Sequence, residues 1–213
     1  MKFALALDIQ EKDKLIRIIE ETHPFVDLFK VGPIALFSFG LEVFKYISRV
    51  RKDVFLDMKF FDIPSVVSRT ISSLGELGVK ILTVHASGGR DILKSAVLSA
   101  RELDIEVAAV TKLTSDDADL ESVLELSEIA ENCGATWVVC QPQFSKDIKA
   151  KTKLKVISPG IRISENTDEH KNTLTPYEAK LVGIDMIVIG RPIVLSDNPY
   201  EQAKKVREMI DLT

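Results

Sequence analysis

The stretch DMKFFDIP, residues 57–64, places two aspartates and a lysine within a few positions directly after the apolar run VFL. Residues two apart in a β-strand leave the same face, so Asp57 and Lys59 should project on the side of Phe55 and away from Leu56. Charged side chains that end an apolar strand are typical of the carboxyl ends of barrel strands, where functional groups gather. This stretch therefore predicts that Asp57 and Lys59 meet inside the mouth of a barrel.

The rest of the chain repeats the same alternation of short apolar segments and longer amphipathic ones. The strand candidates span residues 3–8, 26–32, 54–59, 80–86, 106–113, 136–141, 154–160 and 185–190. Helical patterns cover residues 12–23, 40–52, 64–78, 89–104, 120–134 and 198–210. This order predicts a single (β/α)8 TIM barrel that occupies residues 1–213 as one domain. An open doubly wound sheet is the alternative, and it is weakened because no G-x-G-x-x-G turn follows the first strand.

Composition limits the partners of the protein. The 213 residues carry a formal net charge of −4, which gives no general attraction to nucleic acid or anionic lipid, so a small-molecule partner is expected, with no nucleic acid and no membrane. No stretch reaches the roughly 18 apolar residues of a membrane span, and the first residues lack a signal-peptide pattern, so we expect a cytoplasmic location. Cys133 and Cys140 have no metal-ligand spacing and are expected to be reduced core thiols.

Two further charges end the strands that precede Asp57 and Lys59. Asp8 closes the first strand and Lys30 the second, so neighbouring strands should bring them beside the pair. We call these four residues the charge array. Taken alone, Asp57 and Lys59 could form a structural ion pair, which is common near strand ends. The three histidines have no ligand spacing, and no metal is predicted.

The last two strands end in motifs suited to a phosphate. SPGIR, residues 158–162, and VIGRPI, residues 188–193, lie in the positions where TIM barrels most often hold a phosphate group. Gly190 would permit close backbone approach, and Arg162 and Arg191 would supply paired donors. Between these motifs, residues 163–176 are polar and lack periodicity, which predicts a mobile loop able to cover a ligand.

Together the motifs resemble those of the orotidine 5'-phosphate decarboxylase family. DMKFFDIP is similar to the family signature D-x-K-x-x-D-I-P, and LALD, FKVG, TKLT, SPGIR and VIGRPI follow in the expected order. The resemblance implies a carboxy-lyase without cofactor or metal. Its substrate would be orotidine 5'-phosphate, which it would convert to uridine 5'-phosphate and CO2 in pyrimidine biosynthesis, as a homodimer with shared active sites.

The resemblance also implies a role for each site residue. Lys59 would be the proton donor, and Asp57 would lie beside the substrate carboxylate. Lys30 and Asp8 would complete the array and contact the ribose, whereas Asp62 would enter the partner subunit's site. The remaining substrate-binding residues implied are Thr114 at the pyrimidine edge, with an ordinary turn or cap as its alternative role, and Arg162, Gly190 and Arg191 at the phosphate. One departure is Val66, which stands where the family usually has Thr.

Two other functions stay open at this point. A related barrel could act on a sugar phosphate by metal-assisted aldol or enediolate chemistry, since D-x-K-x-x-D and the phosphate loops are shared. A phosphate-binding barrel without activity is the second. The sequence DIP after the signature and the SPGIR loop favour the decarboxylase over the first, and the intact charge array argues against the second.

Overall fold

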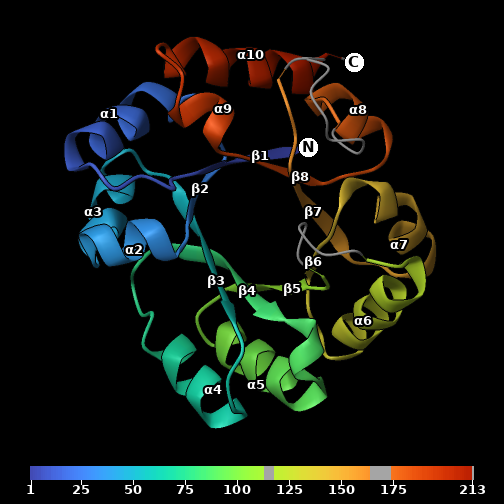
Figure 1. Ribbon diagram of the computed structural model, residues 1–213. Helices are drawn as coiled ribbons and strands as arrows, with labels where there is room; N and C mark the ends of the chain where they lie inside the picture. The colour runs from blue at the N-terminus through green and yellow to red at the C-terminus, as the bar shows by residue number, and fades with distance from the viewer. Residues whose placement is uncertain (113–117, 164–173, 213) are drawn as a thin grey trace.

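The strands form one closed barrel in which every neighbouring pair is parallel (Figure 1). The computed structural model describes residues 1–112, 118–163 and 174–212. The strands are β1 (Lys2–Ala6), β2 (Leu28–Val31), β3 (Asp53–Phe60), β4 (Val79–His85), β5 (Glu106–Val110), β6 (Trp137–Val139), β7 (Lys155–Pro159) and β8 (Met186–Ile189). They pair in chain order, and β1 also pairs with β8, with Ala4 opposite Val188. The predicted TIM barrel is therefore confirmed.

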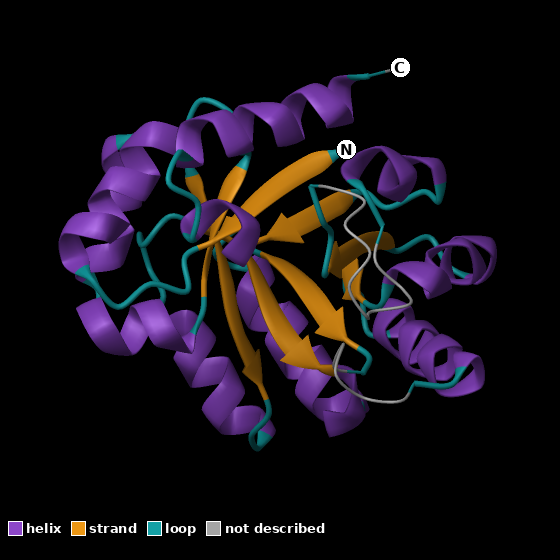
Figure 2. Cartoon of the chain, turned by 45° about the horizontal axis from the view of Figure 1, so that its top comes forward, coloured by secondary structure: helices purple, strands orange, loops and turns teal. Residues whose placement is uncertain are grey.

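The helices form an outer ring around the strands (Figure 2). They are α1 (Lys12–Thr22), α2 (Pro33–Phe39), α3 (Glu42–Arg49), α4 (Pro64–Ser72), α5 (Arg90–Arg101), α6 (Leu120–Asn132), α7 (Ser145–Lys151), α8 (Pro176–Leu181), α9 (Arg191–Val194) and α10 (Pro199–Asp211). Two short 3₁₀ turns, η1 (Ala86–Gly88) and η2 (Pro142–Phe144), follow β4 and β6. Within the described residues, no helix is long and apolar enough to cross a membrane.

Four of the described helices are too short to show the periodicity that identifies longer ones. Helices α2, α7, α8 and α9 have 7, 7, 6 and 4 residues, about two turns or fewer, so their apolar spacing repeats too little to be recognised. Helix α8 begins at Pro176, at the end of the stretch expected to be a loop. Thr175 and Glu178 form a capping box there, since the Glu178 N–H donates to Thr175 Oγ1 and the Thr175 N–H to Glu178 Oε2. The spacing T-x-x-E was the available signal.

Strand alternation divides the apolar residues into two layers. Residues inside the barrel are Ala4, Ala6, Leu28, Phe55, Ile81, Ala108, Trp137, Ile157, Met186 and Val188. Their strand neighbours, such as Leu5, Leu56 and Leu82, belong to the larger core between strands and helices. Because side chains alternate along a strand, any residue two or four positions beyond an inner residue also faces the barrel axis. The inner layer thus determines which polar residues emerge at the mouth.

Arg207 on the last helix, α10, links that helix to the beginning of the barrel. Arg207 Nη2 lies 2.6 Å from Asp27 Oδ2, and its Nε donates to the carbonyl of Phe25 at 2.9 Å. The same Asp27 oxygen accepts the main-chain N–H of Phe3 at 2.7 Å. Helix α10 is thereby attached to β1 and to the turn before β2, next to α1 (Figure 1).

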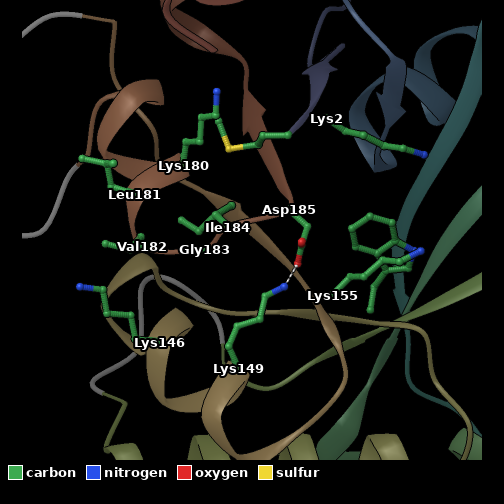
Figure 3. Close-up of a pocket in the computed structure, with 12 residues that line it drawn as sticks. Lys2, Lys146, Lys149, Lys155, Lys180, Leu181, Val182, Gly183, Ile184 and Asp185 are labelled. Atoms are coloured by element: carbon green, nitrogen blue, oxygen red, sulfur yellow. Dashed lines mark ion pairs between the residues drawn. The ribbon is translucent and has the colours of Figure 1, made fainter. Parts of the chain in front are cut away.

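A cavity of about 770 Å³ opens at the amino-terminal end of the strands, away from the charge array (Figure 3). Trp137 is 2% exposed at its base, and its Nε1 donates to Glu106 at 3.0 Å. The ammonium of Lys155 lies 4.9 Å from the centre of the indole. Lys149 and Asp185, which both line the cavity, form an ion pair (Figure 3). Lys149 and Lys155 thus each have a partner within the protein.

We expect Trp137→Ala to lower the free energy of unfolding by about 3–5 kcal/mol, because it leaves a cavity where a large side chain is buried. Turnover per folded molecule should change little, since the charge array lies at the other end of the strands. Urea denaturation checks the first expectation. Tyr177→Ala, at a ring that is 44% exposed, is the control and should cost less than about 1 kcal/mol. A loss no larger than that of the control would contradict this role of Trp137.

Candidate active site

Four charged side chains lie in one row at the mouth of the barrel. Asp8 follows β1, Lys30 belongs to β2, and Asp57 and Lys59 belong to β3. Lys59 Nζ is 2.9 Å from both carboxylate oxygens of Asp57. Lys30 Nζ is 3.3 Å from Asp57 Oδ2 and 3.5 Å from Asp8 Oδ1. The row therefore runs Asp8, Lys30, Asp57, Lys59, with opposite charges as neighbours. The structure brings together the residues of the predicted array.

The middle of the row is buried and its two ends are open. Lys30 and Asp57 have side chains that are 12% and 13% exposed, whereas those of Lys59 and Asp8 are 36% and 42% exposed. A molecule in the mouth can therefore reach the ammonium of Lys59 and the carboxylate of Asp8. The two inner charges are fixed by their neighbours.

The pKa of Asp57 is held below its ordinary value. Burial would raise the pKa by penalising the carboxylate, but the charges of Lys30 and Lys59 outweigh this effect. Hydrogen bonds from Lys59 and from the Thr83 hydroxyl lower it further. Asp57 is consequently a carboxylate at neutral pH.

The backbone at Lys59 has an uncommon conformation. Its φ is +49°, in the left-handed region that non-glycine residues seldom adopt. At this point the pairing of β3 with β4 shifts register, between the pairs Leu56–Leu82 and Phe60–Val84. The main-chain N–H of Lys59 donates instead to the side-chain oxygen of Thr83, at 2.7 Å. Backbone strain of this kind is concentrated at functional sites.

Thr83 is a residue of the site that the sequence reasoning did not identify. Its hydroxyl also donates to Asp57 Oδ1 at 3.0 Å, and the residue is 1% exposed. The signal was its place two residues after Ile81, which faces the inside of the barrel. Alternation along β4 places Thr83 on that face, as it does Asp57 on β3.

Two glycines lie beside the row of charges. A side chain at Gly32 would begin 3.4 Å from Lys30 Nζ and 3.5 Å from Asp8 Oδ1. One at Gly190 would begin 3.2 Å from the Cβ of Ala6 and 4.0 Å from Asp8 Oδ2. Gly190 therefore lies close to the end of β1, and its predicted approach to a phosphate stays a prediction. This contact sets the predicted phosphate motif next to Asp8.

The predicted phosphate residues lie at the ends of β7 and β8. Arg191 is exposed and begins α9 directly after Gly190. Arg162 is half-buried, and its main-chain N–H donates to the carbonyl of Leu174 at 3.0 Å. Thr114 and most of the expected covering loop, residues 164–173, lie outside the described residues.

Asp62 lies beyond the end of β3 and faces solvent in the single chain. Its Oδ1 accepts the main-chain N–H of Ile63 at 2.7 Å. Within the described part of the chain, no hydrogen bond or ion pair joins it to the charge array. Phe61 and Ile63, on either side of Asp62, are 62% and 61% exposed.

Among the described residues, no group of three or more histidine, cysteine, aspartate or glutamate side chains is placed to hold a metal ion.

Comparison with known proteins identifies the family. The sequence model described as "Orotidine 5'-phosphate decarboxylase / HUMPS family" matches residues 1–206. The chain belongs to this family. Orotidine 5'-phosphate decarboxylase of Buchnera aphidicola subsp. Schizaphis graminum is 35% identical, over 97% of this chain and 94% of the relative. The enzyme of Staphylococcus aureus (strain Newman) is also 35% identical, over 96% of both chains.

A solved structure of the family has the same fold. Orotidine 5'-monophosphate decarboxylase from Methanocaldococcus jannaschii, complexed with the inhibitor BMP, superposes with a TM-score of 0.85 at 29% identity. The match covers 99% of this chain and 98% of that one. The family resemblance seen in the motifs is therefore confirmed across the whole barrel. What each residue of the charge array does in this chain stays a prediction.

Proposed function

We propose that this protein is an orotidine 5'-phosphate decarboxylase, a carboxy-lyase that forms uridine 5'-phosphate and CO2 in pyrimidine biosynthesis. The observation that carries the proposal is the charge array, in which the exposed ammonium of Lys59 lies against the buried carboxylate of Asp57. Family membership and the names of the relatives support the same reaction.

The reaction needs a positive charge where Lys59 lies. Breaking the bond between the pyrimidine ring and its carboxylate releases CO2 and leaves the electron pair on the ring carbon. A fixed ammonium stabilises that negative charge because it is oriented before the reaction begins. Lys59 then gives its proton to the same carbon, which completes uridine 5'-phosphate, and regains a proton from solvent.

Asp57 would act on the substrate by repulsion. Two unit negative charges about 4 Å apart repel by about 4 kcal/mol at an effective dielectric constant of about 20. This repulsion falls as the substrate carboxylate becomes neutral CO2. Enzymes lower barriers by up to about 23 kcal/mol, so this contact can supply only a part of the catalysis.

Binding of the phosphate would supply another part. Arg162, Gly190 and Arg191 would hold the phosphate at the ends of β7 and β8, while Asp8 and Lys30 contact the ribose and Thr114 the pyrimidine edge. Binding energy from a remote group can be converted into orientation of the reacting group. Gly190 lies beside Asp8, so the proposed phosphate and ribose sites are contiguous.

We also propose a small-molecule partner and a cytoplasmic location. The substrate would be a small molecule, with no nucleic acid or membrane as partner. Both cysteines are buried and unpaired, and burial raises the pKa of Cys140 to about 12. Such inert thiols suit the reducing cytoplasm, where we place the enzyme.

A single assay tests the reaction. Loss of orotidine 5'-phosphate is followed by its ultraviolet absorbance, with and without a metal chelator. We expect equal activity in both conditions. Activity lost on chelation would instead favour the metal-assisted chemistry of related sugar-phosphate barrels, and no turnover under any condition would refute the proposal.

We expect Lys59→Ala to lower kcat by at least about 10³-fold, because one group both stabilises the carbanion and protonates it. Affinity for uridine 5'-phosphate and the fold should be largely kept, since Lys30 still pairs with Asp57. Lys80→Ala, which removes a lysine paired with Asp104 at the amino-terminal end of β4, is the control and should leave kcat unchanged. Near wild-type turnover of Lys59→Ala would refute the assignment.

Arg191→Ala should lower kcat/KM by about 10–100-fold, because a hydrogen bond to a charged group contributes about 1.5–3 kcal/mol. Both KM and kcat should suffer if the phosphate orients the ring. Orotidine, which lacks the phosphate, is the control substrate and should be turned over equally by mutant and wild type. Arg17→Ala removes an exposed arginine paired with Glu21 on α1 and should have no effect. An equal loss with orotidine would exclude a phosphate role.

We further propose a homodimer in which Asp62 enters the partner's site. The exposed apolar residues Phe61 and Ile63 on either side of Asp62 support an interface there, since burial against a second copy would remove them from water. A carboxylate near the first turn of α4, favoured by the helix dipole, is the alternative role.

Mixing two inactive variants separates these roles. Lys59→Ala chains combined with Asp62→Ala chains should recover up to about a quarter of wild-type activity, because half of random dimers are mixed and each has one intact site. Lys59→Ala chains mixed with the double variant Lys59→Ala/Asp62→Ala are the control and should recover none. Mixed dimers seen by mass spectrometry without activity would place Asp62 in its own subunit's site or in a capping role.

A further inference from the structure

The strands β3 and β4 do not pair evenly beside the charge array. Leu56 lies opposite Leu82, and the next pair is Phe60 opposite Val84. Three residues of β3 therefore lie opposite Thr83 alone. Because the excess is two residues, the strand regains its alternation, and Asp57 and Lys59 stay on the inner face. Bulges next to active sites commonly re-aim a side chain.

Where the main-chain hydrogen bonds between β3 and β4 are interrupted, the side chain of Thr83 supplies hydrogen bonds instead. Its Oγ1 accepts the main-chain N–H of Lys59 at 2.7 Å and lies 3.0 Å from Asp57 Oδ1. A hydroxyl has one proton, so while it accepts from Lys59 it must donate to the carboxylate. Thr83 is 1% exposed, which leaves little access for water to replace either bond. One side chain thus joins the backbone of the proposed proton donor to its counter-ion.

We propose that Thr83 is a positioning residue for the decarboxylation: its hydroxyl holds the left-handed backbone of Lys59 and the carboxylate of Asp57 in one fixed relation. The inference rests on the proposed function of Lys59. Without the hydroxyl, the N–H of Lys59 loses its acceptor and the backbone is free to leave its strained conformation. The ammonium then no longer points reliably at the reacting carbon.

A purely stabilising role is the competing explanation, and the chain contains a matched control. Thr22 is 0% exposed at the end of α1, and its hydroxyl donates to the carbonyl of Ile18 at 2.6 Å. Thr22→Val removes a buried hydroxyl and its bond far from the array. It should affect stability without affecting the reaction.

The groups that face the Asp57 carboxylate determine its pKa, and that pKa can be used to test the positioning role of Thr83. Lys30 on β2 and Lys59 on β3 face its carboxylate, and Asp8 at the end of β1 acts through Lys30. On β4, Thr83 contacts it directly, and the ionisable His85 lies two residues further on, with its ring against Phe61. Loss of the Thr83 bond removes one group that favours the ionised form. We therefore expect the pKa of Asp57 to rise when this bond is lost.

The test compares Thr83→Val, Thr83→Ser and Thr22→Val with the wild type. For Thr83→Val we expect kcat to fall by about 10–100-fold, a loss typical of a small misplacement of a reacting group, with KM changed less than about threefold. Thr83→Ser keeps the hydroxyl and should stay within about threefold of wild type. Thr22→Val should retain both kcat and the pH profile. If Thr83→Val does not fold, Thr83→Ala removes the same hydroxyl and is measured instead.

A second measurement does not depend on turnover. Titration of the Asp57 carboxyl by ¹³C NMR, assigned with Asp57→Asn, should give a higher pKa in Thr83→Val than in the wild type. Wild-type kcat and an unmoved Asp57 pKa in that variant would refute the proposal, as would Thr83→Ser being as slow as Thr83→Val. A wild type that releases no CO2 would refute the proposed function alone, because the NMR comparison still decides whether Thr83 governs Asp57.

Discussion

The buried carboxylate of Asp57 is the group on which the arrangement of the site depends. An isolated buried charge costs several kcal/mol, so Asp57 requires partners from more than one direction. Lys30 reaches it from β2, Lys59 from its own strand and Thr83 from β4. One side chain thus contacts groups from three adjacent strands. An open ammonium can be kept rigid at the mouth because its counter-ion is fixed behind it.

Much of this was predictable from the sequence because one rule governs the inside of the barrel. The inner residues Ala6, Leu28 and Phe55 are each followed two positions later by Asp8, Lys30 and Asp57. Alternation alone therefore predicts that these charges meet above an apolar layer. The same rule places Gly190 after Val188, which explains why the last strand can approach Asp8 closely. The closed barrel was predictable in the same way, because the repeated alternation of strand and helix patterns indicates it without knowledge of any individual contact.

The remaining features depend on the pairing between strands, which a single sequence does not contain. The register shift between β3 and β4 is a property of two segments that lie about 20 residues apart along the chain. The left-handed backbone of Lys59 follows from that shift, since nothing in the local sequence favours a positive φ at a lysine. Asp62 is a related case. Its direction depends on how the chain leaves β3, and its proposed partner is a second copy of the protein.

The paired lysines at the two ends of the barrel differ in backbone conformation rather than in how far they are exposed. At the amino-terminal end, Lys149 pairs with Asp185, and the ammonium of Lys155 lies over Trp137, so these cations are satisfied within the chain. At the carboxyl end, Lys59 is paired with Asp57 and is 36% exposed, close to the 34% of Lys149, but its backbone has a φ of +49°. Strain at such a site is tolerated only when the surrounding structure is rigid enough to impose it. The barrel wall between the two ends, with its closed hydrogen bonding and apolar inner layer, provides that rigidity.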